Sequence, residues 1–136
     1  MKQLSENVWE FDPQIYPQLL WVSVNPTEEE QKQFLSTYTP NGEEEEDLNV
    51  ELEGCNAVVY GVRKKDNKRT GSMIVFESKD TINFDIVAHE SLHVVCRLCA
   101  YCDIPYDNDN HEHIAYLIGW VASCCKKMKK EYDNRS

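Results

Sequence analysis

The chain has 136 residues, of which 41% are hydrophobic and 28% are charged. These values are typical of one soluble globular domain, residues 1–136, and exclude an intrinsically disordered chain. The formal net charge of −10 argues against nucleic-acid binding, because attraction to phosphates requires clustered Lys and Arg.

The first half of the chain predicts strand, helix and loop in turn. Residues 19–24 are aliphatic and aromatic, which predicts a strand. Thr27 followed by Glu30 forms a capping box, so we expect a helix from there to about Tyr38. The acidic run at residues 43–47 is typical of a solvated loop.

The second half predicts a hairpin followed by two helices. Residues 57–62 and 72–76 are strand-like runs joined by a polar turn. Apolar positions spaced by three and four residues predict helices over residues 81–101 and about 110–130. We therefore expect an α+β fold, in which a small, mostly antiparallel sheet packs on the first of these helices and on a second, C-terminal helix.

The same spacing predicts which helix faces are buried. The expected stripe of the first helix is Ile82, Ile86, His89, His93, Cys96 and Ala100. The expected stripe of the second helix, which should face the first, is mostly small: Glu112, Ala115, Gly119 and Ala122.

The compartment can also be predicted. The N-terminus has no basic segment followed by an apolar one, and no apolar run approaches the ~20 residues that span a bilayer. We expect a cytoplasmic protein without membrane contact, whose six cysteines are thiols or metal ligands. Cys96, Cys99 and Cys102 drift round a helix, which favours core packing over a second metal site. A disulfide between Cys96 and Cys124 would require an oxidising compartment.

Residues 89–93 form the motif His-Glu-x-x-His within the first predicted helix. His89 and His93 lie four residues apart, so both imidazoles can reach one metal ion. Glu90 lies about 100° round the helix, where it can hold a water bound to that metal. Zinc lowers the pKa of such water towards about 7, and Glu90 can accept its proton during attack on a carbonyl. The motif thus predicts zinc-dependent hydrolysis.

The competing interpretation is that both histidines are structural. On an apolar stripe, each unpaired imidazole would cost roughly 1–3 kcal/mol. Hydrogen bonds to carbonyls or carboxylates would remove this cost, as would a metal ion. We favour the metal because one ion satisfies both rings.

Catalytic zinc needs a third protein ligand, for which Glu112 is the candidate because it lies on the stripe expected to face the first helix. Alternatively, Glu112 closes a capping box with Asp109. His111 and His113 are also suitable ligands, pointing about 100° to either side of Glu112.

The Glu112 assignment sets a condition on the helices. If the first helix runs straight to Cys102, His93 lies about 13 Å from its end, whereas Glu112 lies only about 4–5 Å into the second helix. The assignment therefore requires the first helix to end or bend near Cys99, or the second helix to begin earlier.

Residues 88–93, followed by residues 112–120, resemble short zincin-like proteins of phages and prophages. Those proteins carry A-H-E-x-x-H followed by E-x-x-A-Y-L-x-G-W, and the resemblance covers mainly residues 72–121. It implies a glutamate-zincin site with His89, His93 and Glu112 as zinc ligands and Glu90 as base. It also implies an edge strand, here residues 72–76, that binds extended substrate beside the helix, although these residues could equally form an ordinary sheet strand.

A hydrolase also needs a donor for the oxyanion formed at the attacked carbonyl. Tyr116, one turn after Glu112, is the candidate, with His111 or His113 as alternatives. The competing interpretation of Tyr116 is an aromatic side chain packed at the helix contact.

These residues predict a zinc-dependent metallopeptidase or amide hydrolase that acts on a peptide or protein substrate. The alternative is a non-catalytic, zinc-stabilised binding module of a mobile element, whose acidic surface contacts a protein partner. A protein with two structural histidines and no metal is a third hypothesis. The sequence leaves the oligomeric state open.

Overall fold

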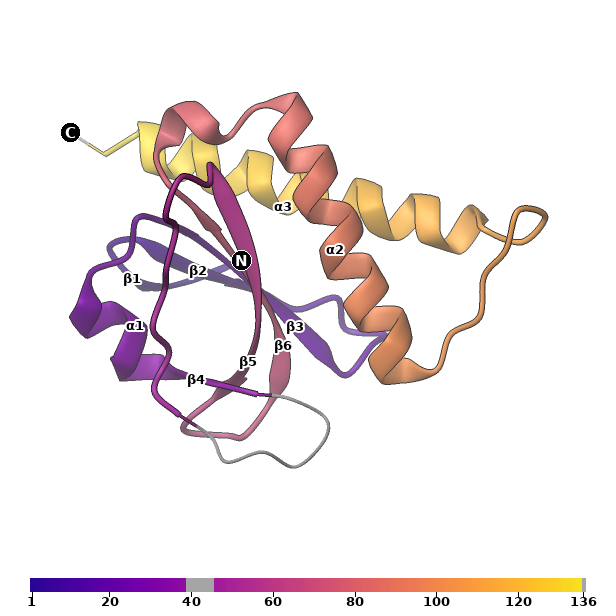
Figure 1. Ribbon diagram of the computed structural model, residues 1–136, viewed down its shortest axis with the longest axis horizontal. Coiled ribbons are helices and arrows are strands. Elements are labelled where there is room, and N and C mark those ends of the chain that lie inside the picture. The colour runs from indigo at the N-terminus through magenta and orange to yellow at the C-terminus, as the bar shows by residue number, and fades with distance from the viewer. Residues whose placement is uncertain (39–45, 136) are drawn as a thin grey trace.

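A computed structural model describes residues 1–38 and 46–135 (Figure 1). Most of the acidic run predicted as a loop, residues 43–45, lies outside the described residues. The described part is α+β, with three α-helices and a curled sheet of six strands. In their order across the sheet, the strands are β1 (Lys2–Ser5), β2 (Val8–Phe11), β3 (Gln18–Val24), β6 (Thr70–Phe76), β5 (Ala57–Lys64) and β4 (Leu35–Thr37). The helices are α1 (Glu28–Phe34), α2 (Phe84–Cys102) and α3 (Glu112–Asp133), with a short 3₁₀ turn at Lys79–Thr81.

The two central strands pair in parallel, with Gln18 opposite Thr70 and Val24 opposite Phe76. The other pairings between described strands are antiparallel. Every residue of β3 and β6 is buried, so both faces of the sheet are covered at its centre. Successive side chains enter opposite cores, because side chains alternate along a strand.

One core lies between the sheet and the two long helices, where Val22 and Ile74 meet Val95 of α2 and Val121 of α3. The core on the opposite face contains Trp21, Leu35, Leu48 and Met73, among others. An ion pair between Lys64 Nζ of β5 and Glu10 Oε1 of β2, 3.0 Å apart, is largely buried and links two strands that are not adjacent in the sheet. The sheet therefore separates two cores, and α2 and α3 belong to only one of them.

The predicted capping box at the start of α1 is confirmed, because the Thr27 and Glu30 side chains each accept a hydrogen bond from the other's backbone N–H. The predicted end of this helix near Tyr38 is wrong. The helix ends at Phe34 and the chain continues as β4, in which Leu35 is only 1% exposed. Helix α1 buries none of its residues, so burying Leu35 against the sheet outweighs further helical turns.

The hairpin predicted from residues 57–62 and 72–76 is confirmed as β5 and β6. Helices α2 and α3 begin and end within three residues of the predicted bounds, at 84–102 and 112–133. No helix within residues 1–38 and 46–135 combines the length and the apolar character needed to cross a membrane.

The predicted buried faces of these two helices are confirmed only at the start of the first, where Ile82 is buried and Ile86 packs against the core, and are wrong for most of the other residues. His89 and His93 are exposed, and the buried face of α2 carries Val94, Val95 and Leu98 instead. On α3, Ala115 and Gly119 are exposed, and the buried residues are Ile114, Leu117, Val121, Cys124, Cys125 and Met128. In each case the face with larger apolar side chains is buried, because it removes more apolar area from water.

Glu30 joins α1 to the turn between β1 and β2. Its carboxylate accepts hydrogen bonds from Ser5 Oγ, from Asn7 N at 3.0 Å, from Asn7 Nδ2 at 2.7 Å and from Thr27 N at 3.0 Å. Burial acts to raise the pKa of Glu30, but these hydrogen bonds outweigh burial and lower the pKa from 4.5 to about 2. The folded pKa is below the unfolded one, so the stabilisation is complete above pH 4.5 and is lost as the pH falls towards 2.

We expect Glu30→Gln to lower the free energy of unfolding at pH 7 by about 1–3 kcal/mol, because it weakens a helix cap and removes the charge from several hydrogen bonds. Urea denaturation at pH 7 and at pH 3 measures the effect, and the difference between variant and wild type should shrink at pH 3. The control is Glu29→Gln, an exposed acid in the same helical turn. Equal destabilisation by both variants would contradict the role of Glu30.

Candidate functional site

Helix α2 carries the candidate site along one border of its buried face. The helix begins after Asn83, whose Oδ1 accepts a hydrogen bond from Ile86 N at 3.1 Å. Its buried residues hold it against the sheet at β5 and β6. Side chains on the adjacent face therefore project towards the start of β5.

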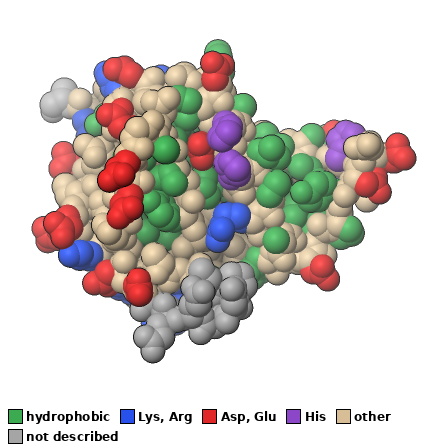
Figure 2. All heavy atoms as spheres, in the orientation of Figure 1, with side chains coloured by type: hydrophobic (Ala, Val, Ile, Leu, Met, Phe, Trp, Pro, Cys, Tyr) green, Lys and Arg blue, Asp and Glu red, His purple; other side chains and the backbone are tan. Residues whose placement is uncertain are grey.

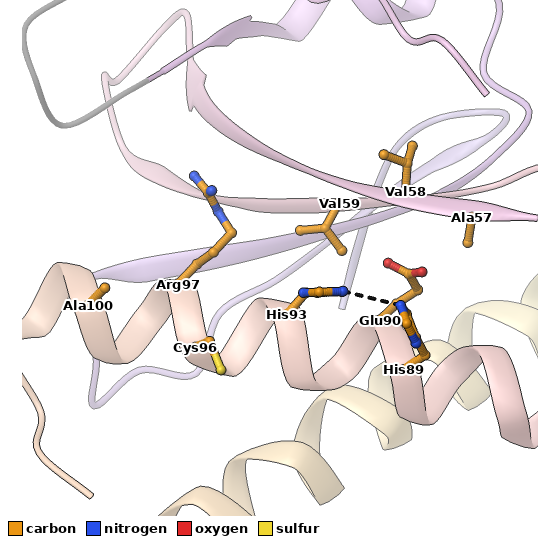
Figure 3. Close-up of a pocket in the computed structure, with 9 residues that line it drawn as sticks. All are labelled: Ala57, Val58, Val59, His89, Glu90, His93, Cys96, Arg97 and Ala100. Carbon is orange, nitrogen blue, oxygen red and sulfur yellow. Dashed lines mark hydrogen bonds between the residues drawn. The ribbon is translucent and has the colours of Figure 1, made fainter. Parts of the chain in front are cut away.

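A pocket opens between α2 and β5 (Figure 3). One wall comes from the first three residues of β5 and the other from one face of α2. The lining residues are Ala57, Val58, Val59, His89, Glu90, His93, Cys96, Arg97 and Ala100. Figure 2 shows adjacent histidines at the surface, with hydrophobic side chains on both sides of them. The motif residues thus meet in one pocket.

The imidazoles of His89 and His93 converge, with their Nε2 atoms 3.2 Å apart and their ring planes at 70°. Two nitrogens that bind one tetrahedral zinc ion at 2.0–2.1 Å lie about 3.3 Å apart. The pair therefore has the spacing of two metal ligands. The same distance also suits a hydrogen bond between neutral imidazoles. Because both rings are exposed, the cost of burying unpaired imidazoles, which favoured a metal at the sequence level, does not apply.

Glu90 is 7% exposed and lines the pocket beside the histidines. Figure 3 shows its carboxylate next to His89 and directed towards β5. Among the described residues, this carboxylate has no hydrogen-bond or ion-pair partner. A carboxylate that faces a pocket without a protein partner is available to accept hydrogen bonds from a ligand or a bound water.

Comparisons with protein families, curated proteins and solved structures found no match. The resemblance to zincin-like proteins of phages therefore stays a prediction from the motif residues.

The structure does not bring Glu112 to the histidine pair. Helix α2 continues to Cys102 and α3 begins only at Glu112, so neither condition for this ligand is met. Glu112 is exposed at the start of α3. Within the described ranges, no three His, Cys, Asp or Glu side chains are grouped as metal ligands. In this conformation Glu112 does not complete a site with His89 and His93.

The two other candidate ligands hold the loop before α3. His111 Nδ1 lies 3.2 Å from the Asp107 carbonyl oxygen, and His113 Nε2 lies 3.0 Å from the Pro105 carbonyl oxygen. The proposed capping box of Glu112 with Asp109 is absent from this loop, because His111 is the residue that precedes the helix. Both imidazoles thus bond to loop carbonyls at the start of α3.

Tyr116 lies outside the histidine pocket. It is 75% exposed and lines a different hollow, beside Ile15 and Trp120. Neither the oxyanion role nor the packed-aromatic interpretation describes this position. The described lining of the histidine pocket contains no tyrosine.

The strand predicted to hold substrate is wrong, because residues 72–76 lie in β6, which is paired on one side with β3 and on the other with β5. The free edge near the histidines belongs to β5. Strand β4 pairs only with residues 62–64 of β5, and Tyr38 N extends this pairing to the Gly61 carbonyl oxygen at 3.0 Å.

Two residues of β5 present unpaired backbone at this edge. Hydrogen bonds from Glu77 N to Asn56 O and from Lys64 N to Arg69 O show that even-numbered residues of β5 bond towards β6. The N–H and C=O groups of Ala57 and Val59 therefore point outwards, where no described strand pairs with them. The hairpin predicted from the sequence implies that the backbone hydrogen bonds of β5 alternate in direction from residue to residue. It does not indicate which edge of the strand lacks a neighbouring strand.

The six cysteines are free thiols. The core-packing prediction is confirmed for Cys99, which is buried, whereas Cys96 and Cys102 are half-buried. Of the other three cysteines, Cys124 and Cys125 are buried and Cys55 is exposed. Cys96 Sγ lies 3.6 Å from Tyr106 Oη. Burial raises the pKa of Cys124 to about 12 and also raises that of Cys125.

We expect iodoacetamide at pH 8 to alkylate Cys55 first in the native protein and to spare Cys124 and Cys125, because only exposed thiolates react. Peptide mapping by mass spectrometry over a time course measures each site. The urea-unfolded protein is the control, in which all six sites should react at comparable rates. Labelling of Cys124 as fast as Cys55 in the native protein would contradict the burial described here.

Proposed function

We propose that this protein is a zinc-dependent amide hydrolase of the metallopeptidase type, in which His89 and His93 bind the metal and Glu90 is the general base. The observation that carries this proposal is the 3.2 Å approach of the two Nε2 atoms beside a carboxylate without a partner. Zinc bound there would polarise a substrate carbonyl and lower the pKa of a bound water.

Glu90 acts on the proton of the nucleophilic water. Its carboxylate accepts that proton as the water attacks the carbonyl, and it then donates the proton to the leaving amine. The position of Glu90 between α2 and β5 supports this role, because the carboxylate faces the pocket instead of joining the two ring nitrogens. The apolar side chains of Ala57 and Val59, which lie on the α2 side of the sheet, reduce the competition of bulk water in this pocket.

The substrate in this proposal is an extended peptide lying along β5. The outward N–H and C=O groups of Ala57 and Val59 can pair with its backbone, as a further strand added to the sheet edge. Such pairing places a peptide amide over the histidine pair. We propose this arrangement of an edge strand beside a motif-bearing helix as the zincin-like part of the fold.

One observation favours the alternative function, a zinc-stabilised binding module without turnover. The described residues supply two nitrogen ligands, and the predicted third ligand Glu112 and oxyanion donor Tyr116 lie elsewhere. Catalytic zinc sites usually have three protein ligands. A module of this kind would bind a protein partner through the same edge and keep the metal for structure.

The first test is the zinc content of untagged protein, measured by elemental mass spectrometry after zinc is supplied and excess is removed. We expect about one zinc per chain in the wild type and a loss in His89→Ala and His93→Ala, because each removes one nitrogen ligand. His113→Ala is the matched control and should retain zinc, as should Glu90→Gln. Retention in Glu112→Ala would support a site of two histidines, and loss would support the three-ligand site. Absence of zinc from folded wild-type protein would contradict the proposal.

The second test is hydrolysis of a mixed peptide library by zinc-loaded protein. We expect Glu90→Gln to retain zinc and to lose about 10²–10⁴-fold in rate, because it removes the general base. Glu53→Gln, an exposed acid outside the pocket, should hydrolyse at the wild-type rate. If zinc is bound and the wild type cleaves no peptide, the hydrolase is wrong and the binding module is favoured.

A further inference from the structure

Arg97 is a pocket residue that the motif does not explain. It follows His93 by four residues, so the two side chains lie one above the other on the same face of α2. It lines the same pocket, and Figure 3 shows its side chain extended from α2 towards β5. The guanidinium group of Arg97 therefore lies on the same face of α2 as the two imidazoles, about one turn further along the helix.

The guanidinium of Arg97 has no hydrogen-bond or ion-pair partner among residues 1–38 and 46–135. Other basic side chains of the described part do pair with carboxylates: Lys32, Lys64, Lys65, Arg69, Lys79 and Arg135. The N–H donors of Arg97 are thus available to a ligand in the pocket.

Gly61 provides the place where this guanidinium rests against β5. A Cβ atom at Gly61 would lie 1.8 Å from Arg97 Nη2 and 2.9 Å from the Tyr38 carbonyl oxygen. Only glycine leaves room for the guanidinium in this position. Arg97 is therefore held beside the strand edge, at the point where the pairing with β4 begins.

The open edge of β5 connects the histidine pair to Arg97. In Figure 3, Ala57 lies near Glu90, Val59 lies across from His93, and Arg97 lies further along the same strand. One turn of helix separates His93 from Arg97, which is about 6 Å along the axis. An extended chain covers that distance in about two residues. A peptide with one amide at the histidines would present a group to Arg97 about two residues away.

We propose that Arg97 recognises a carboxylate of the bound peptide, about two residues from the amide held at His89 and His93. The placement of that amide rests on the proposed function, and the carboxylate recognition does not. A guanidinium binds a carboxylate through two parallel hydrogen bonds, which a lysine in the same place cannot form. The carboxylate is either the C-terminus of the peptide or the side chain of Asp or Glu.

Three probe tetrapeptides of one core sequence test this proposal. The first has a free C-terminal carboxylate, the second a C-terminal amide, and the third a C-terminal amide with glutamate as its last residue. Calorimetry or NMR titration of the full chain without added zinc measures their dissociation constants. We expect the first or the third to bind about tenfold more tightly than the neutral peptide, and whichever does identifies the source of the carboxylate.

Arg97→Gln should remove this preference, measured as the ratio of the dissociation constants for the neutral and carboxylate peptides, and Arg97→Lys should restore only part of it. Arg69→Gln is the matched control, because it removes the same charge from a residue that pairs with Asp12 outside the pocket, and it should keep the preference. Gly61→Ala should weaken the preference although Arg97 is retained, with circular dichroism and thermal unfolding as checks on the fold.

The proposal is overturned if the wild type shows no preference for a carboxylate peptide, or if Arg97→Gln keeps that preference. The His89→Ala variant distinguishes the proposal of zinc binding from the proposal of carboxylate recognition. It should lose zinc and keep the carboxylate preference, so a failure of metal binding and a failure of carboxylate recognition are read in different measurements.

Discussion

The parallel pairing of β3 with β6 is the constraint on which the rest of the structure depends. Both strands are buried throughout, so apolar side chains must cover each face of the sheet. The long helices cover one face, and β6 leads directly into the segment that precedes α2. Once β6 lies in the centre, α2 must return across β5, and its motif residues face the border of that strand.

Local patterns could be predicted from the sequence because each depends on neighbours in the chain. The capping box of α1, the hairpin of β5 and β6, and the two long helices are of this kind. The pairing of residues 18–24 with residues 70–76 carries no comparable local pattern. The short strand β4 was missed for the same reason, since its residues pair across the chain with residues 62–64.

The candidate site was predicted only where one helix supplies all of its parts. The spacing of His89 and His93 fixes their approach on any straight helix, and Glu90 follows from the same geometry. The prediction that Glu112 is a ligand depended on which faces of α2 and α3 pack together. The face of α3 with larger apolar side chains is the buried one, and the face with small residues is not. Arg97 could have been noted from its spacing, but its contact with Gly61 depends on the tertiary fold.

Both walls of the pocket come from a single contiguous part of the chain, residues 57–100, which runs through β5, β6 and α2. The N-terminal strands and α3 contribute none of its lining residues and act as a support behind it. Sequence changes in those supporting parts therefore alter how stably residues 57–100 are held in the fold. The relative placement of the β5 edge and helix α2 is set by contacts within residues 57–100. Specificity and stability can consequently change in separate regions of this chain.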